Sequence, residues 1–140
     1  MTEKRFKTWN PPTFDKNNMT RWNWMCQHHE KLKLGKYVDI GAFTYINAQK
    51  GVQIDDNVQI GSHCSLYSIS TIDAKEGKIL LKENCRIGTH SVIMPGVTIG
   101  KNAIIGAFSF VNTDIPENTL AYGVPAKKIR KLTAKEVQEL

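Results

Sequence analysis

The chain has 140 residues, a formal net charge of +6 and three cysteines. This length suits a single domain, and no apolar stretch approaches the ~20 residues that a membrane-spanning helix needs. The chain shows no signal-peptide pattern, so we expect a soluble, cytoplasmic protein. Its positive charge favours anionic ligands. The basic residues are scattered and no nucleic-acid-binding motif accompanies them, so we expect small anions, and neither nucleic acid nor a membrane, as partners.

Residues 1–33 differ in composition from the rest of the chain and contain all three tryptophans. After a candidate N-cap at Thr20, hydrophobic and aromatic residues recur at helical spacing: Trp22, Met25, Cys26, His29 and Leu32. This spacing predicts a short amphipathic helix. We expect the segment to cap the first repeat of the domain that follows, since an uncovered sheet end is a pairing hazard. Alternatively, its aromatic rings stack on a sugar or a base.

One aliphatic position recurs every six residues from Leu34 onward, with two interruptions. The position falls on Leu34, Ile40, Ile46, Ile54, Ile60, Leu66, Leu81, Ile87, Ile93, Ile99, Ile105 and Val111. Glycine often follows it directly, and the residue two places before it is small or apolar. A short strand with one buried face, followed by a sharp turn, explains this pattern. Six residues cannot form a packed unit alone, so the repeats must stack as a parallel β-solenoid.

Two interruptions and one terminal motif organise the chain. Residues 47–51 add a bulge, whereas residues 67–78 leave the register and form a candidate functional loop, because loops inserted in repeats often carry function. Thr133 and Glu136 have the spacing of a capping box, which predicts a helix from about residue 134. We therefore expect an aromatic cap segment at 1–33, a repeat domain at 34–131 and a C-terminal helix at 132–140.

The repeat of an aliphatic residue, a glycine and four further residues resembles the hexapeptide repeat of the left-handed parallel β-helix acyltransferases. Three stretches are similar to the C-terminal half of the sugar acetyltransferases of that family, namely 95–100 (PGVTIG), 115–118 (IPEN) and 122–126 (YGVPA). The resemblance extends over residues 34–131. It implies an all-β, left-handed parallel β-helix with three hexads per triangular coil. It also implies acetyl-CoA as co-substrate and a homotrimer with its sites between subunits.

With three hexads per coil, every third repeat places its residues on the same corner of the next coil, about 4.8 Å away. One corner then presents asparagines, which tolerate the left-handed conformation of a tight turn: Asn57, Asn84 and Asn102. Another corner presents aromatic and imidazole rings: Phe43, His63, His90 and Phe108. We therefore expect His63 and His90 to be stacked neighbours although they are 27 residues apart in sequence.

Acyl transfer from a thioester needs a nucleophilic acceptor, and a general base such as histidine can generate it. Enzymes similar to the galactoside acetyltransferase carry this histidine in the loop that corresponds to residues 67–78. Here the matching position is Thr71, and the loop contains no histidine. Either the base has moved to His63 or His90, or the acceptor is an amine, which attacks a thioester more readily than a sugar hydroxyl does. We expect His63 to take the proton and His90 to contribute less. Both histidines also fit a purely structural role in their turns.

The resemblance also assigns ligand-binding positions. For acetyl-CoA these are two residues at a late corner and a following segment whose basic residues suit phosphate: Gly106, Ala107, Ala126, Lys127, Lys128 and Arg130. For the acceptor we expect residues of the loop: Tyr67, Ser68, Thr71 and Asp73. No metal is expected. Cys64 and Cys85 fall on inward repeat positions, where we expect core residues and neither nucleophiles nor metal ligands.

Four functions stay open. The first is acetyl-CoA-dependent N-acetylation of an amino-deoxy sugar, linked to a nucleotide and destined for a surface polysaccharide such as lipopolysaccharide. The second is O-acetylation of a sugar hydroxyl with His63 or His90 as base. A zinc enzyme of the same fold would need three converging histidines, and the wide separation of His63 and His90 argues against it. A non-catalytic trimeric scaffold would bind no coenzyme A.

Overall fold

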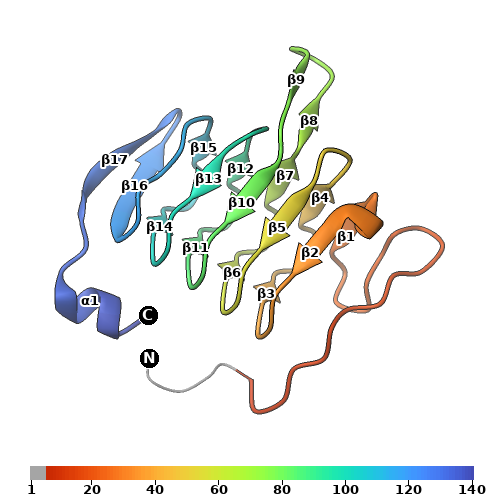
Figure 1. Cartoon of the computed structure of the whole chain (residues 1–140), viewed down its shortest axis with the longest axis horizontal. Helices are drawn as coiled ribbons and strands as arrows, with labels where there is room; N and C mark the ends of the chain where they lie inside the picture. Colours follow the sequence, from red (N-terminus) through yellow and green to blue (C-terminus); the bar gives the residue numbers. More distant parts are fainter. Residues whose placement is uncertain (1–5) are drawn as a thin grey trace.

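The computed structural model describes residues 6–140 as a stack of coils, each built from short strands on three faces (Figure 1). The first face contains β1 (Met25–Gln27), β4 (Tyr45–Asn47), β7 (Ser65–Tyr67), β12 (Val92–Ile93) and β15 (Phe110–Val111). The second face contains β2 (Leu32–Leu34), β5 (Val52–Ile54), β10 (Ile79–Leu81) and β13 (Thr98–Ile99). The third face contains β3 (Asp39–Ile40), β6 (Gln59–Ile60), β11 (Arg86–Ile87), β14 (Ile104–Ile105), β16 (Thr119–Gly123) and β17 (Ala126–Lys131).

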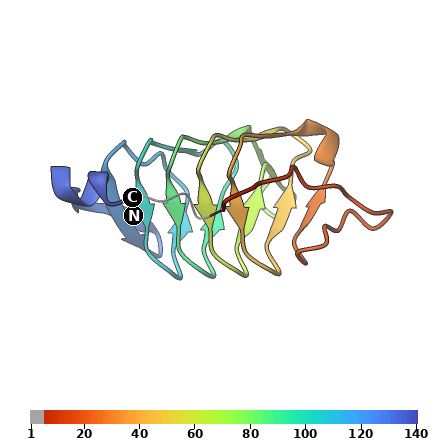
Figure 2. The ribbon, with the colours of Figure 1, turned by 90° about the horizontal axis from the view of Figure 1, so that it is seen from below.

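Neighbouring strands on these faces pair in parallel, except for the terminal β16 and β17, which pair antiparallel. Seen along the other direction, the coils follow one another in a regular row (Figure 2). The parallel β-solenoid predicted from the six-residue repeat is therefore confirmed.

The six-residue register forms the core. Pairing in register brings Ile46 beside Leu66 and Leu66 beside Ile93, so equivalent side chains line up along the interior. Every aliphatic register position except the half-buried Leu34 is buried, as are the small residues two places before the positions from Ile40 onward. Inward hydroxyl groups are satisfied too, since the Thr44 Oγ1 donates to the Gly61 carbonyl at 3.0 Å.

Turn residues take two different backbone roles at each corner. A Cβ added to Gly88 would lie 2.4 Å from the backbone nitrogen of Ala107, so glycine is needed here because the next coil approaches closely. Two residues after such a glycine, or at the equivalent place, the chain takes a left-handed conformation. The predicted asparagine corner adopts it, with φ values of 61°, 62° and 60° at Asn57, Asn84 and Asn102.

The N-terminal segment differs from the helix predicted for it. Met25–Gln27 forms strand β1, which pairs with β4, and only His29–Lys31 forms a helical turn, of the 3-10 type. Trp24 and Cys26 are buried while Met25 between them is half-buried, which is the alternation of a strand. Pairing with an existing strand thus decides the conformation of a short segment whose spacing fitted both structures. The first coil accordingly begins before residue 34.

The segment before β1 covers the first coil, as a cap would. Trp9 and Phe14 pack against the core, and the Trp9 indole donates a hydrogen bond to the Val38 carbonyl at 2.9 Å. Phe14 meets Trp24 edge to face with ring centroids 5.6 Å apart. The first five residues of the predicted cap segment lie outside the described residues.

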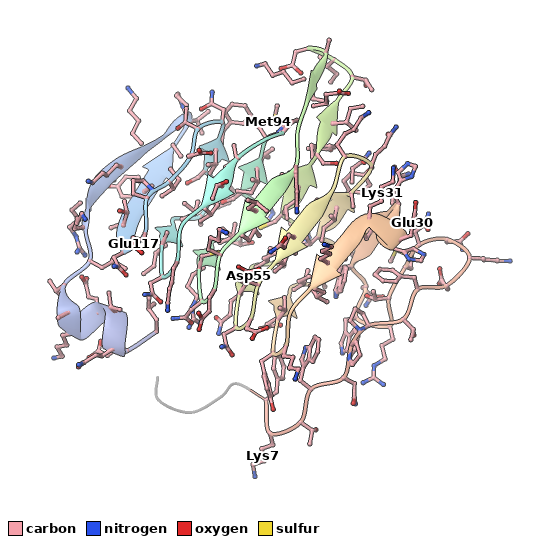
Figure 3. The ribbon with its side chains drawn as sticks, viewed as in Figure 1. Lys7, Glu30, Lys31, Asp55, Met94 and Glu117 are labelled. Carbon is pink, nitrogen blue, oxygen red and sulfur yellow. The ribbon has the colours of Figure 1, made fainter. Side chains whose placement is uncertain are left out.

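The interruption at residues 67–78 is an antiparallel hairpin of β8 (Ile69–Ser70) and β9 (Lys75–Glu76) that projects from the stack (Figure 1). Its tip carries Ile72, which is 98% exposed. The base of the hairpin is close-packed, because a Cβ on Gly77 would lie 2.9 Å from the Gly96 Cα. Met94, two residues before Gly96, lies along the same edge of the stack (Figure 3).

The C-terminal helix α1 (Ala134–Gln138) is confirmed, together with its capping box. The Glu136 backbone N–H donates to Thr133 Oγ1 at 3.2 Å, and the Thr133 N–H donates to the Glu136 carboxylate at 2.7 Å. Hydrogen bonds from Arg130 hold the pKa of Glu136 at about 2, well below its usual value. No helix within residues 6–140 is long and apolar enough to cross a membrane.

Candidate active site

Two histidines and two phenylalanines form a continuous ring stack along the corner between the third and first faces. All four residues are left-handed, with φ of 65°, 58°, 59° and 60° at Phe43, His63, His90 and Phe108. The His63 and His90 rings are stacked and nearly parallel, with an interplanar angle of 5° and centroids 4.7 Å apart. The phenyl rings flank them, at 5.1 Å from His63 to Phe43 and 4.9 Å from His90 to Phe108. The stacking of His63 on His90 predicted from the repeat is confirmed.

The backbone of this corner is held by the stacking of coils. The His63 N–H donates to the Ala42 carbonyl at 3.0 Å, and the His90 N–H donates to the Ser62 carbonyl at 3.1 Å. These two amides are therefore used within the fold and do not serve as donors to a developing oxyanion.

Thr89 orients the His90 ring. Its Oγ1 donates to the Ser62 carbonyl at 2.8 Å and lies 2.9 Å from His90 Nδ1 and 3.2 Å from Ser62 Oγ. A hydroxyl group has one proton and two lone pairs. The Ser62 carbonyl can only accept, so with the hydroxyl proton on that carbonyl Nδ1 of a neutral His90 donates to Thr89, and Nε2 is left unprotonated. No hydrogen bond within residues 6–140 orients the His63 ring in this way. The sequence analysis missed the contact between Thr89 and His90, because nothing in the sequence distinguishes Thr89.

The stack is open on its outer side. His63 and His90 are both exposed, and Phe43 and Phe108 are 65% and 66% exposed in the single chain. Cys64, the inward neighbour of His63, is fully buried, and so is Cys85 beside Asn84 on the asparagine corner. Burial raises the pKa of the Cys85 thiol to about 12 and also raises that of Cys64, so neither is a nucleophilic thiolate at neutral pH.

The positions assigned to acetyl-CoA continue from this corner towards the C-terminus. Gly106 and Ala107 directly precede Phe108, and Tyr122 packs so closely that its Cβ would lie 2.8 Å from a Cβ on Gly106. Beyond them, β17 carries the remaining residues. Ala126 is buried and has little surface to offer a ligand, whereas Lys127 and Lys128 are exposed.

Arg130 has a different partner from the phosphate expected for it. Its guanidinium group binds the Glu136 carboxylate through two hydrogen bonds of 2.7 and 2.9 Å. The side chain is thereby joined to the cap of α1, and its charge is offset within the chain. Sequence spacing could have suggested this pair only once β17 and α1 were known to adjoin.

The loop residues assigned to the acceptor do not meet the histidines within one chain. The hairpin leaves the stack between the first and second faces, whereas the histidines lie between the third and first. Ser68 is fully buried, and its hydroxyl donates to the Asn47 carbonyl at 2.7 Å, which gives it a structural role.

Tyr67 packs on Tyr45 with ring centroids 5.4 Å apart, and Thr71 is exposed. Asp73 accepts a hydrogen bond from Ser70 and pairs with Lys75 at 3.1 Å. Both contacts lower the pKa of the Asp73 carboxyl group, so it is ionised at neutral pH.

Comparisons with known proteins agree with this architecture. Residues 78–113 match the family described as "Bacterial transferase hexapeptide (six repeats)". A galactoside O-acetyltransferase of Lactococcus lactis subsp. lactis (strain IL1403) is 34% identical over 113 residues, which are 70% of this chain and 55% of the relative. The chain thus spans about half the length of the curated relatives it matches.

Two solved structures are also similar. A hexapeptide-repeat acetyltransferase of Vibrio cholerae O1 biovar eltor, in complex with acetyl-coenzyme A, superposes with a TM-score of 0.74 and 28% identity, covering 79% of this chain and 65% of that one. A maltose O-acetyltransferase of Clostridium difficile 630 gives a TM-score of 0.70 and 28% identity, covering 79% and 64%. The chain belongs to the hexapeptide-repeat transferase family, and its fold is the left-handed parallel β-helix of that family.

Proposed function

We propose that this protein is an acetyltransferase that moves the acetyl group of acetyl-CoA to a sugar acceptor at the corner formed by His63 and His90. The observation that carries the proposal is the hydrogen bonding of Thr89, which orients the exposed imidazole of His90 and leaves one of its nitrogens unprotonated. The names of the relatives support the reaction, because they include galactoside and maltose O-acetyltransferases and a structure in complex with acetyl-coenzyme A.

His90 is the general base in this mechanism, in place of the His63 favoured by the sequence. Its Nε2 accepts the acceptor's proton as the acceptor nitrogen or oxygen attacks the thioester carbonyl carbon. The tetrahedral adduct then collapses, the carbon–sulfur bond breaks, and the coenzyme A sulfur leaves with the proton returned by His90. The imidazolium ion formed in between lies against the Phe108 ring, whose centroid is 4.9 Å away, and a cation over an aromatic face is stabilised.

The acceptor we favour is the amino group of an amino-deoxy sugar, with a nucleotide-linked sugar for a surface polysaccharide as the natural source. A neutral amine is a stronger nucleophile than a hydroxyl, and the hairpin lacks the histidine of the galactoside enzymes. O-acetylation is the second candidate. It is favoured by the names of the relatives and by the oriented His90, which would suit a hydroxyl acceptor equally well.

Acetyl-CoA would extend from His90 past Gly106 and Ala107, with its phosphates near Lys127 and Lys128. A second copy of the chain would complete the site, as in a homotrimer. Two exposed phenyl rings flank the histidines, and the hairpin lies on another corner of its own chain. Both features suit a site with one wall supplied by a neighbour.

Replacing Lys127 and Lys128 together by alanine should weaken acetyl-CoA binding by roughly 1 to 2 kcal/mol, the scale of one or two hydrogen bonds to charged groups. Titration by isothermal calorimetry, with thermal stabilisation by acetyl-CoA as a second readout, measures this directly. The loss should be smaller for dephospho-coenzyme A, which lacks the 3′-phosphate.

The matched control is the Lys33 and Lys36 double variant. It removes the same charge from two exposed lysines at the opposite end of the stack and should keep normal affinity. Equal losses in the two double variants would mean that only net charge matters. The absence of any acetyl-CoA binding by the unmodified protein would contradict the proposed function itself.

A further inference from the structure

A cavity of about 220 Å³ lies at the N-terminal end of the β-helix, outside the histidine corner. Its lining includes Trp9, Trp22 and Trp24, which are all the tryptophans of the chain. The floor is apolar, since Trp24, Val38 and Ile40 are buried. Ligand pockets usually combine such an apolar lining with a few polar groups.

The walls of this cavity are held in place by contacts within the chain. Trp9 is anchored by its hydrogen bond to the Val38 carbonyl at 2.9 Å. Trp24 packs edge to face against Phe14, and Phe14 stacks on His29 with ring centroids 4.3 Å apart. Lys7, in the same N-terminal segment, points away from the coils (Figure 3). Because Trp9 and Trp24 are held in these positions, the pocket exists before any ligand binds, and binding requires little ordering of side chains.

Trp22 is the feature that a cap alone does not explain. Its side chain is 41% exposed at the cavity, although a residue that only sealed the core would be buried. The Arg21 guanidinium carbon lies 4.5 Å from the Trp22 ring centroid. The Arg21 cation thus occupies one face of the indole ring, which leaves the other face for a ligand.

We propose that this cavity binds a saccharide ring. The face of an indole is electron-rich, and the C–H groups on one face of a pyranose are weakly electropositive, so the two surfaces attract each other. Polar side chains in the lining, including Thr8, Asn10 and Arg21, offer hydrogen-bonding groups for the sugar hydroxyls. A nucleobase would gain most from two parallel rings, and Arg21 already takes one side of Trp22.

The pocket is close to the histidine corner but separate from it. Trp22 adjoins Asn23, whose carbonyl accepts the Phe43 N–H at 2.7 Å, so Asn23 begins the column that leads to His63. Two coil steps separate Asn23 from His63, about 10 Å along the axis. Binding of a sugar ring in this pocket does not depend on the proposed function. Only the further statement that this ring is part of the acceptor molecule rests on the proposed function.

Because no tryptophan lies outside the pocket, intrinsic tryptophan fluorescence reports ligands bound there. We expect methyl β-D-galactopyranoside to change this fluorescence saturably, and deoxythymidine monophosphate to compete poorly. Trp22→Ala should weaken glycoside binding by roughly tenfold, as expected for loss of an aromatic contact, with Trp9 and Trp24 still reporting. Trp22→Phe, which keeps a ring face, should retain most of the affinity.

The proposal is overturned if the glycoside gives no saturable change, if Trp22→Ala binds it as well as the unmodified protein does, or if only the nucleotide binds. Acetyl-CoA titration of the same variants separates this proposal from the transferase function. Trp22→Ala should bind acetyl-CoA normally whichever result the glycoside gives.

Discussion

His90→Ala should lower kcat for acetyl transfer by roughly 10²- to 10⁴-fold, the usual contribution of a positioned general base. The variant loses the nitrogen that accepts the acceptor's proton, while its exposed position leaves the buried core unchanged. Acetyl-CoA affinity should therefore stay near normal. His63→Ala should reduce kcat less, because the His63 ring stacks on His90 but lacks its fixed orientation. Steady-state assays on purified variants measure both effects.

Thr89 variants separate orientation of His90 from simple packing. Thr89→Val keeps the shape of the side chain but removes the hydroxyl group, so it should lower kcat by roughly tenfold, the value of one such hydrogen bond. Thr89→Ser should retain activity. The ¹⁵N chemical shifts of the His90 ring should show a proton on Nδ1 in the unmodified protein and in Thr89→Ser, and redistribution to Nε2 in Thr89→Val. Identical spectra and rates in the three proteins would remove Thr89 from the mechanism.

Ile93→Ala should lower the free energy of unfolding by about 2 to 5 kcal/mol. Ile93 is fully buried in the middle of the stack, between Leu66 on one coil and Val111 on the next. Truncation leaves a cavity between strands that cannot collapse towards each other, because both neighbours are held by their own coils. Urea unfolding followed by circular dichroism measures the change.

Ile72→Ala provides the matched control for this prediction. The same substitution at the tip of the hairpin, where the side chain is 98% exposed, should change the free energy of unfolding by no more than about 0.5 kcal/mol. Similar losses at both positions would show that stability does not reside in the column of inward aliphatic residues.

The repeat made most of the fold predictable from the sequence. A period of six predicts the burial of residues such as Cys64 from counting alone, and the three hexads per coil implied by the family resemblance then predict the stacking of His63 on His90. The capping box at Thr133 was equally local. Both predictions depend on short spacings, which one sequence displays fully.

Features that depend on contacts between unlike elements were not predictable in this way. Residues 20–32 fit a helical spacing, but β1 forms because β4 offers a strand to pair with. Arg130 was assigned to phosphate because the sequence does not reveal that Glu136 lies beside it. The orientation of His90 likewise depends on Ser62, which is 28 residues away in sequence and one coil away in space.

The most direct test of the account is mass spectrometry of the products formed from acetyl-CoA and matched acceptors, one an amino sugar and the other its hydroxyl counterpart. We predict an acetylated amino sugar as the main product and its loss in His90→Ala. Acetylation of the hydroxyl sugar alone would contradict the amine acceptor. Undiminished transfer by His90→Ala, or none from the unmodified protein to either acceptor, would contradict the proposal that His90 is the base of an acetyltransferase.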